Sequence, residues 1–271
     1  MKRFIVLGNP VEQSLSPFLH NWIFKKFNIN AKYYKLKCDL DDLVFNINKL
    51  RENSVHGLNI TIPFKSKVID HLDIINDRAK IIGSVNCITM RNNKVMGFNT
   101  DWFGFSKLLI DNKIDIIDKE IIVFGAGGAA KAIIYALTLN GIKKIRLFNR
   151  KIENAQKLEN SFVSVHSLKD LKYFIKKDSI IVNCTPLGMN DKKMPFNKKF
   201  LNKNQLIIDT IYNIKRTKLL DLGEKKGAFV INGLDMFIYQ GIASLDLWLE
   251  ENIFDIININ KIKQIMKEKL C

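Results

Sequence analysis

The amino-acid sequence predicts an α/β fold with two domains, and three observations support this prediction. The apolar run Ile121–Phe124 leads directly into the glycine-rich stretch Gly125–Ala130, as a central parallel strand leads into a tight strand-to-helix turn. Short apolar runs recur after it at intervals typical of a parallel sheet. Before it, strand-like and helix-like patterns are mixed, which indicates a separate α/β domain.

Composition indicates a globular chain with ample core. Of its 271 residues, 47% are hydrophobic and 26% are charged. The formal net charge of +16 raises nucleic acid as a partner. The lysines are scattered, however, and no basic stripe alternates with aromatic residues, so we expect no specific nucleic-acid binding. A basic surface would still attract anionic small molecules.

The cysteines and histidines give no sign of a metal site. The four cysteines include no close pair, and the histidines never fall at metal-ligand spacing, so we expect surface or turn positions for the histidines. Unpaired thiols suit a reducing cytoplasm. The apolar run after Met1–Arg3 is too short for a signal peptide, and no segment approaches a membrane span, so a cytoplasmic protein is expected.

The first elements follow from local patterns. Phe4–Leu7 reads as a buried strand that ends at a Gly-Asn-Pro turn. A helix is predicted from Pro17, with Ser16 as its N-cap. Tyr33–Cys38 alternates like a strand, and Leu40–Leu50 has helical spacing.

The next strand is predicted to carry a polar face. In Leu58–Lys65, a period of two places Asn59 and Thr61 on one face, and Leu58, Ile60 and Ile62 on the core face. Pro63 ends the strand. Lys65 then lies just past a strand end, where clefts of α/β proteins open.

The remaining elements of the first half are a helix, a hairpin and a second helix. The helix is predicted over Val68–Ile75. The hairpin joins Ser84–Met90 to Lys94–Phe98, and the second helix runs from Trp102 to Lys113.

The second half reads as a Rossmann domain of about residues 105–236. After Ile121–Phe124, its expected strands are Lys144–Phe148, Ile180–Asn183, Leu206–Asp209 and Val230–Asn232. Helices are expected over Met236–Glu250 and Ile259–Leu270. Residues 237–271 are predicted to pack back on an N-terminal substrate domain of residues 1–104.

The glycine-rich stretch predicts a dinucleotide site. Gly125–Ala130 fits the G-x-G-x-x-G/A pattern with Ala130 last, between a strand and a helix. The following strand ends in Asn149-Arg150-Lys151, without the acidic residue that holds the ribose hydroxyls of NAD. A guanidinium can bind a 2′-phosphate in a bidentate manner, so NADP is the predicted cofactor.

Several polar motifs in order closely resemble those of the shikimate dehydrogenase family, which includes the quinate/shikimate dehydrogenases. They span essentially the whole chain: Gly8–Pro10 with Ser14–Pro17, Asn59–Lys65, Gly83–Asn86, Asn99–Asp101, Gly125–Ala130, Asn149–Arg150, Asn183–Met189, Asp209–Tyr212, Gly233 and Gln240–Gly241. The resemblance implies reversible NADPH-dependent reduction of 3-dehydroshikimate to shikimate, a step of aromatic amino-acid (chorismate) biosynthesis. It would make the chain an oxidoreductase that acts on a CH–OH group.

The resemblance also implies roles for individual residues. Lys65 and Asp101 correspond to the catalytic pair. The implied substrate contacts are Ser14, Ser16, Asn59, Thr61, Lys65, Asn86, Asp101, Tyr212 and Gln240. The implied cofactor contacts are Asp77, Gly125, Ala126, Gly127, Gly128, Ala129, Ala130, Asn149, Arg150, Lys151, Thr185, Thr210 and Gly233.

The chain departs from the family pattern after Tyr212. Ile214 and Lys218 stand where prolines are usual, although Thr217 remains. Position 237 is Phe where the family more often has Leu, and position 245 is Leu where Phe is usual. We interpret these two changes as compensation within the core.

Two alternatives stay open at this stage. A quinate-using relative could accept NAD, although Arg150 and the Ser14/Ser16 pair disfavour it. A non-catalytic NADP-binding sensor would keep the glycine-rich turn but would not need both Lys65 and Asp101. A homodimer is compatible with either.

Overall fold

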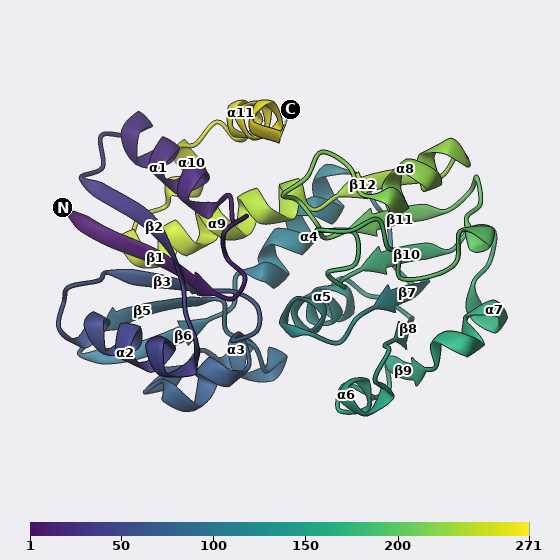
Figure 1. Cartoon of the computed structure of the whole chain (residues 1–271), viewed down its shortest axis with the longest axis horizontal. Helices are drawn as coiled ribbons and strands as arrows, with labels where there is room; N and C mark the ends of the chain where they lie inside the picture. Colours follow the sequence, from purple (N-terminus) through teal and green to yellow (C-terminus); the bar gives the residue numbers. More distant parts are fainter. Residues whose placement is uncertain (271) are drawn as a thin grey trace. The chain divides into compact units, whose positions relative to one another are not determined.

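The computed structural model describes residues 1–270, which form two compact units (Figure 1). Unit 1 comprises Met1–Gly104 and Ile238–Met266, and unit 2 comprises Phe105–Phe237 and the terminal residues from Lys267. Each unit contains a six-stranded sheet with helices packed against it. The predicted α/β class is confirmed. Cys271 lies outside the described residues.

The sheet of unit 1 is mixed and has the order β2-β1-β3-β5-β6-β4. Strand β1 is parallel to β2 and β3, whereas β5 is antiparallel to β3 and β6. The strands are β1 (Lys2–Gly8), β2 (Ala31–Lys37), β3 (Gly57–Ile60), β4 (Ile74–Ile75), β5 (Cys87–Arg91) and β6 (Lys94–Phe98).

Helices cover both faces of this sheet, because its strands bury side chains on both sides. Phe4 stacks on Trp248 of α9, whereas Leu7 packs in a cluster with Leu43 of α2. The helices that contribute to unit 1 are α1 (Ser16–Lys26), α2 (Leu40–Arg51), α3 (Asp77–Ile82), α4 (Asp101–Asp111), α9 (Leu234–Leu249), α10 (Ile253–Ile256) and α11 (Ile259–Leu270).

The sheet of unit 2 is parallel throughout and has the order β12-β11-β10-β7-β8-β9. From the other edge this is the 3-2-1-4-5-6 order of a Rossmann fold, with β7 as its first strand. The strands are β7 (Glu120–Phe124), β8 (Lys144–Phe148), β9 (Val163–His166), β10 (Ile180–Asn183), β11 (Leu206–Asp209) and β12 (Phe229–Asn232). The helices are α5 (Gly128–Leu139), α6 (Ile152–Gln156), α7 (Leu171–Phe174) and α8 (Lys218–Lys225).

The predicted helix over 68–75 is wrong. The segment forms a 3₁₀ turn (Lys67–His71) and then strand β4, and the helix α3 begins only at Asp77. The segment pairs with strand β6, since the backbone amides of Asp73 and Asn76 donate to the carbonyls of Val95 and Gly97. Pairing with the sheet therefore overrides the helical spacing of the apolar residues.

Three single-residue expectations also fail. Ile62 is 50% exposed, because β3 ends at Ile60 and the alternation stops there. Ser16 is the first residue of α1 and not its N-cap; its amide donates to Ser14 Oγ (3.3 Å). His20 is fully buried and stacks on Tyr33, whereas a surface or turn position was expected.

Within residues 1–270, no helix is both long and apolar enough to cross a lipid bilayer.

Candidate active site

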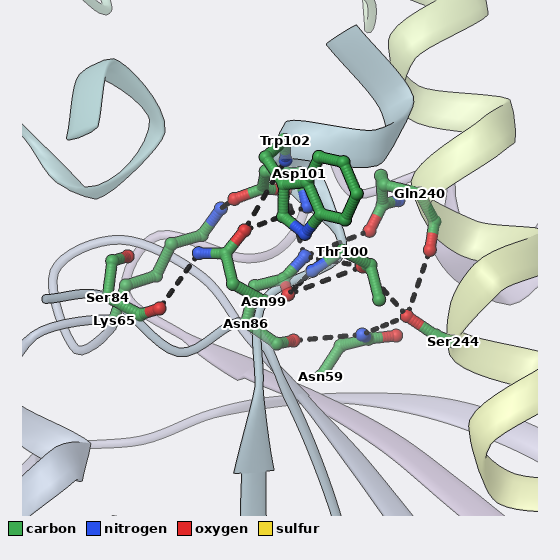
Figure 2. A network of polar contacts seen from close by, with 10 residues as sticks. All are labelled: Asn59, Lys65, Ser84, Asn86, Asn99, Thr100, Asp101, Trp102, Gln240 and Ser244. Carbon is green, nitrogen blue, oxygen red and sulfur yellow. Dashed lines mark hydrogen bonds and ion pairs between the residues drawn. The ribbon is translucent and has the colours of Figure 1, made fainter. Parts of the chain in front are cut away.

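Lys65 and Asp101 form a close ion pair in unit 1, with Nζ donating to Oδ2 at 2.6 Å (Figure 2). Lys65 follows β3 and Asp101 is the first residue of α4. The side chains are only 15% and 6% exposed, which strengthens the attraction relative to a surface pair. Within the described residues, no other acceptor takes the two remaining hydrogens of the ammonium group.

Asn86 holds the other side of the Asp101 carboxylate. Its Nδ2 donates to Asp101 Oδ1 (2.9 Å), and to Gln240 Oε1 at 3.3 Å. Its Oδ1 accepts from the backbone amide of Thr100 (2.7 Å). Asn86 precedes β5, and the amide of Asp101 is itself capped by Asn99 Oδ1 (3.0 Å). The carboxylate is thus held by an ammonium and an amide.

Asn59 extends this network beneath the ion pair (Figure 2). On β3 it is 6% exposed, and it faces α9 while Leu58 and Ile60 enter the opposite core, as the period of two predicted. Its Nδ2 donates to the carbonyl of Asn86 and to Ser244 Oγ. The structure therefore brings together five of the predicted site residues: Asn59, Lys65, Asn86, Asp101 and Gln240.

Ser14, Ser16 and Thr61 also lie in unit 1 but have no hydrogen bond to this network within the described residues. Ser14 and Ser16 contact each other across the start of α1. Thr61 is fixed by its amide, which donates to Leu7 O (2.9 Å), and its methyl group packs where Gly8 has no side chain.

Tyr212 belongs to unit 2, where its ring stacks on Phe237 with 4.0 Å between centroids. The aromatic residue at position 237 therefore serves as a platform for Tyr212. The opposite size change, Leu245, is fully buried in unit 1.

The turn after β7 has the shape of a phosphate cradle. Gly125 has φ of +103°, which favours glycine, and a Cβ there would lie 3.1 Å from the backbone of Cys184. A Cβ on Gly127 would meet no atom within 4 Å, so this side of the turn is open to a ligand. The twelve-residue helix α5 starts at Gly128 without an acidic residue in its first turn. Its free amides and positive end suit an anion.

A basic segment follows β8, the strand next to this turn. Arg150 and Lys151 are exposed, and Asn149 Nδ2 donates to the carbonyl of Lys151 (2.7 Å). Among the described residues, no carboxylate lies within ion-pair distance of Arg150 or Lys151. These two cations are thus available to an anionic ligand, and the residues of unit 2 fit a dinucleotide that carries a third phosphate.

A buried network supports the ends of β10 and β11. Asp209 accepts hydrogen bonds from Asn183 Nδ2 (3.0 Å) and Thr217 Oγ1 (2.7 Å). Asn183 Oδ1 accepts from the hydroxyl of Thr185 (2.7 Å), which lies beside the Gly125 turn. Burial raises the pKa of the Asp209 carboxyl to about 6.

Gly233 and Thr210 approach each other closely, since a Cβ on Gly233 would overlap the carbonyl of Thr210. The close packing therefore explains why position 233 is glycine.

Asp77 is exposed in the first turn of α3 and belongs to unit 1, whereas the other predicted cofactor residues belong to unit 2.

Two residues of the unit 1 network were missed from sequence. Ser244 accepts from Asn59, and Tyr33 donates to Asn59 Oδ1 (2.6 Å). Ser244 lies one helical turn after Gln240, which was the available signal. For Tyr33 the only signal was its place on the inward face of an alternating strand.

The three thiols among the described residues are not arranged as nucleophiles. Burial raises the pKa of Cys38 to about 11 and that of Cys87 to about 12. Cys184 is also free, and burial raises its pKa too. Among residues 1–270, no group of three or more potential ligands is placed to hold a metal ion.

Comparisons with known proteins are consistent over both units. Residues 6–88 match the family model described as the shikimate dehydrogenase substrate binding domain, and residues 108–209 match the one described as shikimate / quinate 5-dehydrogenase. The shikimate dehydrogenase (NADP(+)) of Clostridium beijerinckii is 36% identical over 252 residues, which is 92% of this chain and 93% of the relative.

Solved structures of shikimate dehydrogenases are similar to this chain over nearly its whole length. Shikimate dehydrogenase from Aquifex aeolicus is similar with a TM-score of 0.87 at 35% identity, over 98% of this chain and 97% of that one. The enzyme of Thermus thermophilus, solved in complex with NADP(H) and shikimate, has a TM-score of 0.86 at 27% identity, with both chains fully covered.

Proposed function

This chain belongs to the shikimate dehydrogenase family, and from that membership we propose that it catalyses the reversible NADPH-dependent reduction of 3-dehydroshikimate to shikimate. It is then an NADP-dependent oxidoreductase of aromatic amino-acid biosynthesis. The single observation that carries the proposal is the close, partly buried Lys65–Asp101 ion pair, with Asn86 and Gln240 near the carboxylate.

The pair suits acid–base chemistry on a carbonyl. NADPH supplies the hydride when it is bound. Lys65 donates a proton from its ammonium group to the ketone oxygen during reduction, and its neutral amine accepts that proton during oxidation. Asp101 holds the ammonium in place and accepts a hydrogen bond from a substrate hydroxyl. Two hydrogens of the Lys65 ammonium have no acceptor among the described residues, which supports its role as a donor to substrate.

Substrate recognition is assigned to hydroxyl and amide groups, which match a small polyhydroxylated acid. The substrate contacts in this proposal are Ser14, Ser16, Asn59, Thr61, Lys65, Asn86, Asp101, Tyr212 and Gln240. Its cofactor contacts are the turn Gly125–Ala130, the segment Asn149–Lys151, and Asp77, Thr185, Thr210 and Gly233. Apart from Tyr212 and Asp77, unit 1 would then supply the substrate contacts and unit 2 the cofactor contacts, close to the expected division into 1–104 with 237–271 and 105–236.

The proposal extends to NADP selectivity. Arg150 and Lys151 are exposed cations at the end of the strand beside the Gly125 turn, where a 2′-phosphate would meet them. The open side of Gly127 and the amides of α5 would receive the pyrophosphate.

We also propose a cytoplasmic location and a homodimer. The free cysteines support the location, since reduced thiols persist in a reducing compartment. Subcellular fractionation checks the location. Light scattering of the purified protein checks the assembly, with the mass of one 31.3 kDa chain as the result against a dimer.

The decisive experiment follows NADPH oxidation after addition of 3-dehydroshikimate, with NADH and 3-dehydroquinate tested in the same series. We expect turnover with 3-dehydroshikimate and a strong preference for NADPH. Better turnover of 3-dehydroquinate with NADH would support the quinate-using alternative. NADPH binding without turnover of either ketone would support a sensor and refute the proposed activity.

A further inference from the structure

Tyr33 and Ser244 bear buried hydroxyl groups that the proposed reaction does not use. Tyr33 is 2% exposed on β2, and Ser244 is fully buried on α9. The two hydroxyls lie at opposite ends of the Asn59 side chain, which Tyr33 contacts at the oxygen and Ser244 at the nitrogen. Tyr33 and Ser244 therefore contact the hydrogen-bond network at Asn59, and neither contacts the Lys65–Asp101 ion pair.

The two contacts fix the orientation of the Asn59 amide. Tyr33 OH donates to Oδ1 at 2.6 Å, while Nδ2 donates to Asn86 O at 2.9 Å and to Ser244 Oγ at 3.1 Å. The flipped amide would set its oxygen against the carbonyl oxygen of Asn86, which brings two acceptors together. Both amide hydrogens are thus used within the protein.

Tyr33 is itself held rigidly. The Asn21 side chain pairs with both its backbone amide and its carbonyl, each at 2.9 Å. Its ring stacks on His20 with 4.3 Å between centroids and 11° between planes. The hydroxyl of Tyr33 is therefore aimed at Asn59 by groups that have no other part in the site.

Ser244 connects three segments through one hydroxyl group. It accepts from Asn59, donates to the Gln240 carbonyl (3.0 Å), and lies 3.2 Å from the hydroxyl of Thr100. Figure 2 shows Ser244 at the meeting point of Asn59, Thr100 and Gln240. The hydroxyl links β3 and the residue before α4 to the helix that bears Gln240.

We propose that Tyr33 and Ser244 are positioning residues for substrate binding, which act by holding the Asn59 amide and, through it, the Asn86 segment. This inference rests on the proposed function, since it concerns the same substrate site. Neither residue touches the Lys65–Asp101 pair, so their loss should weaken substrate binding and leave the proton transfer in place.

The test removes one hydroxyl at a time. Tyr33→Phe deletes the donor to Asn59 and keeps the stacked ring. We expect the KM for shikimate to rise about tenfold, because a buried Asn59 oxygen loses its partner, and kcat to change less than about threefold. The KM for NADP should stay within about twofold of the wild-type value. The matched control is Tyr34→Phe, which deletes the hydroxyl of the neighbouring exposed tyrosine and should change none of these three constants.

Ser244→Ala provides an independent arm, and it decides the matter if Tyr33→Phe fails to fold. It should also raise the KM for shikimate, since it removes the acceptor of Asn59. In the double variant the two increases should not multiply, because both act on one amide.

A lower melting temperature with an unchanged KM for shikimate would mean that the hydroxyls are merely structural, and would overturn the inference. Multiplying effects would overturn the shared route through Asn59. Absence of turnover in the wild type would instead refute the proposed function.

Discussion

The side-chain amide of Asn86 can adopt only one orientation, because each of its ends faces a group of fixed character. Its oxygen accepts from the Thr100 amide, and its nitrogen donates to a carboxylate oxygen of Asp101. A flip would put N–H against N–H and oxygen against oxygen. The Asp101 carboxylate is therefore held from both sides before any substrate arrives, which is the preorganisation that a catalytic pair requires.

Removal of the Lys65 ammonium should affect chemistry more than binding. For Lys65→Ala we expect kcat to fall by about 10²–10⁴-fold, the usual contribution of a positioned proton donor, with a small change in the KM for shikimate. Steady-state kinetics in both directions measures this. The control is Lys67→Ala, which removes an exposed lysine two residues away. A variant that loses substrate binding but keeps kcat at saturation would contradict the acid–base role.

Arg150 should discriminate between the two dinucleotides. In Arg150→Ala the KM for NADP should rise about tenfold or more, because a charge-assisted contact to the 2′-phosphate is lost, while the KM for NAD should change little. Lys177→Ala, an exposed lysine of the same unit, is the control. Equal losses for both dinucleotides would refute the assignment.

The five clustered site residues were predictable because each lies in a motif that can be identified along the chain. Asn59, Lys65, Asn86 and Asp101 stand on or next to a predicted strand or helix start, and Gln240 was implied by the family resemblance. Tyr33 and Ser244 could not be predicted in this way. Their contacts with Asn59 arise only when β2 joins the sheet and α9 returns to it, which no local pattern specifies.

Helix α8 begins without the proline that the family pattern has at position 218. Thr217, which remains from the family pattern, is the N-cap of the helix: its Oγ1 accepts from the Leu220 amide, and its hydroxyl group donates to the buried Asp209. An N-cap of this kind is typically worth about 1 kcal/mol. The start of the helix is thus defined by a hydroxyl group, although Lys218 occupies its first position.

Restoring the proline should stabilise unit 2. Lys218 is the first helical residue, where the amide has no acceptor within the helix, and Thr217 has the extended backbone that a following proline prefers (φ −80°, ψ 160°). We expect Lys218→Pro to raise the free energy of unfolding by about 0.4–1 kcal/mol, measured by denaturant titration.

The matched control places proline three residues later. Asp221 donates its amide to Thr217 O (3.0 Å), so Asp221→Pro should cost about 3 kcal/mol. Equal destabilisation by both prolines would show that position 218 does not have the predicted helical geometry.

Among the helices and strands, the parallel strands of unit 2 were the easiest to predict. Lys144–Phe148, Ile180–Asn183 and Leu206–Asp209 match the predicted bounds. The last two are short apolar runs, as is typical of a strand buried on both faces, whereas Lys144–Phe148 alternates charged and apolar residues over its first four positions. The short helices α6 and α8 and the strand β9 were not predicted, because four to eight residues hold too little periodicity. The segment 68–75 was mispredicted because its partner strand β6 decides its structure.

Each unit contains a buried group whose shifted pKa affects stability between about pH 3 and 6.5: His20 in unit 1 and Asp209 in unit 2. Burial lowers the pKa of His20, in unit 1, from 6.5 to about 3, and no hydrogen-bond partner for either ring nitrogen lies within residues 1–270. Burial raises the pKa of Asp209, in unit 2, from 3.8 to about 6. Shifts of this size correspond to free energies on the order of 3–5 kcal/mol.

The two groups respond to pH in opposite directions. Between pH 6.5 and about 3, the unfolded chain protonates His20 and the folded chain does not, so the stability of unit 1 falls on acidification. Between pH 3.8 and about 6, the folded chain keeps the proton on Asp209 and the unfolded chain has lost it. The contribution of Asp209 is therefore complete below pH 3.8 and is lost as the pH rises through 6. Acidification from pH 6.5 to 4 should destabilise unit 1 and stabilise unit 2.

Single substitutions separate the two effects. Relative to the wild type, the thermal stability of His20→Leu should improve as the pH falls from 6.5 to 4, because no buried imidazole remains to be protonated on unfolding. The relative stability of Asp209→Asn should improve as the pH rises from 4 to 6, since the amide mimics the protonated acid at every pH. Calorimetric melting at several pH values measures both, with the wild type at the same pH as reference.

Since the residues lie in different units, each difference should appear in the transition of its own unit if the two units melt separately. Parallel pH profiles for the three proteins would contradict the assignment, because a group that titrates alike in the folded and unfolded chain cannot change the pH dependence of stability.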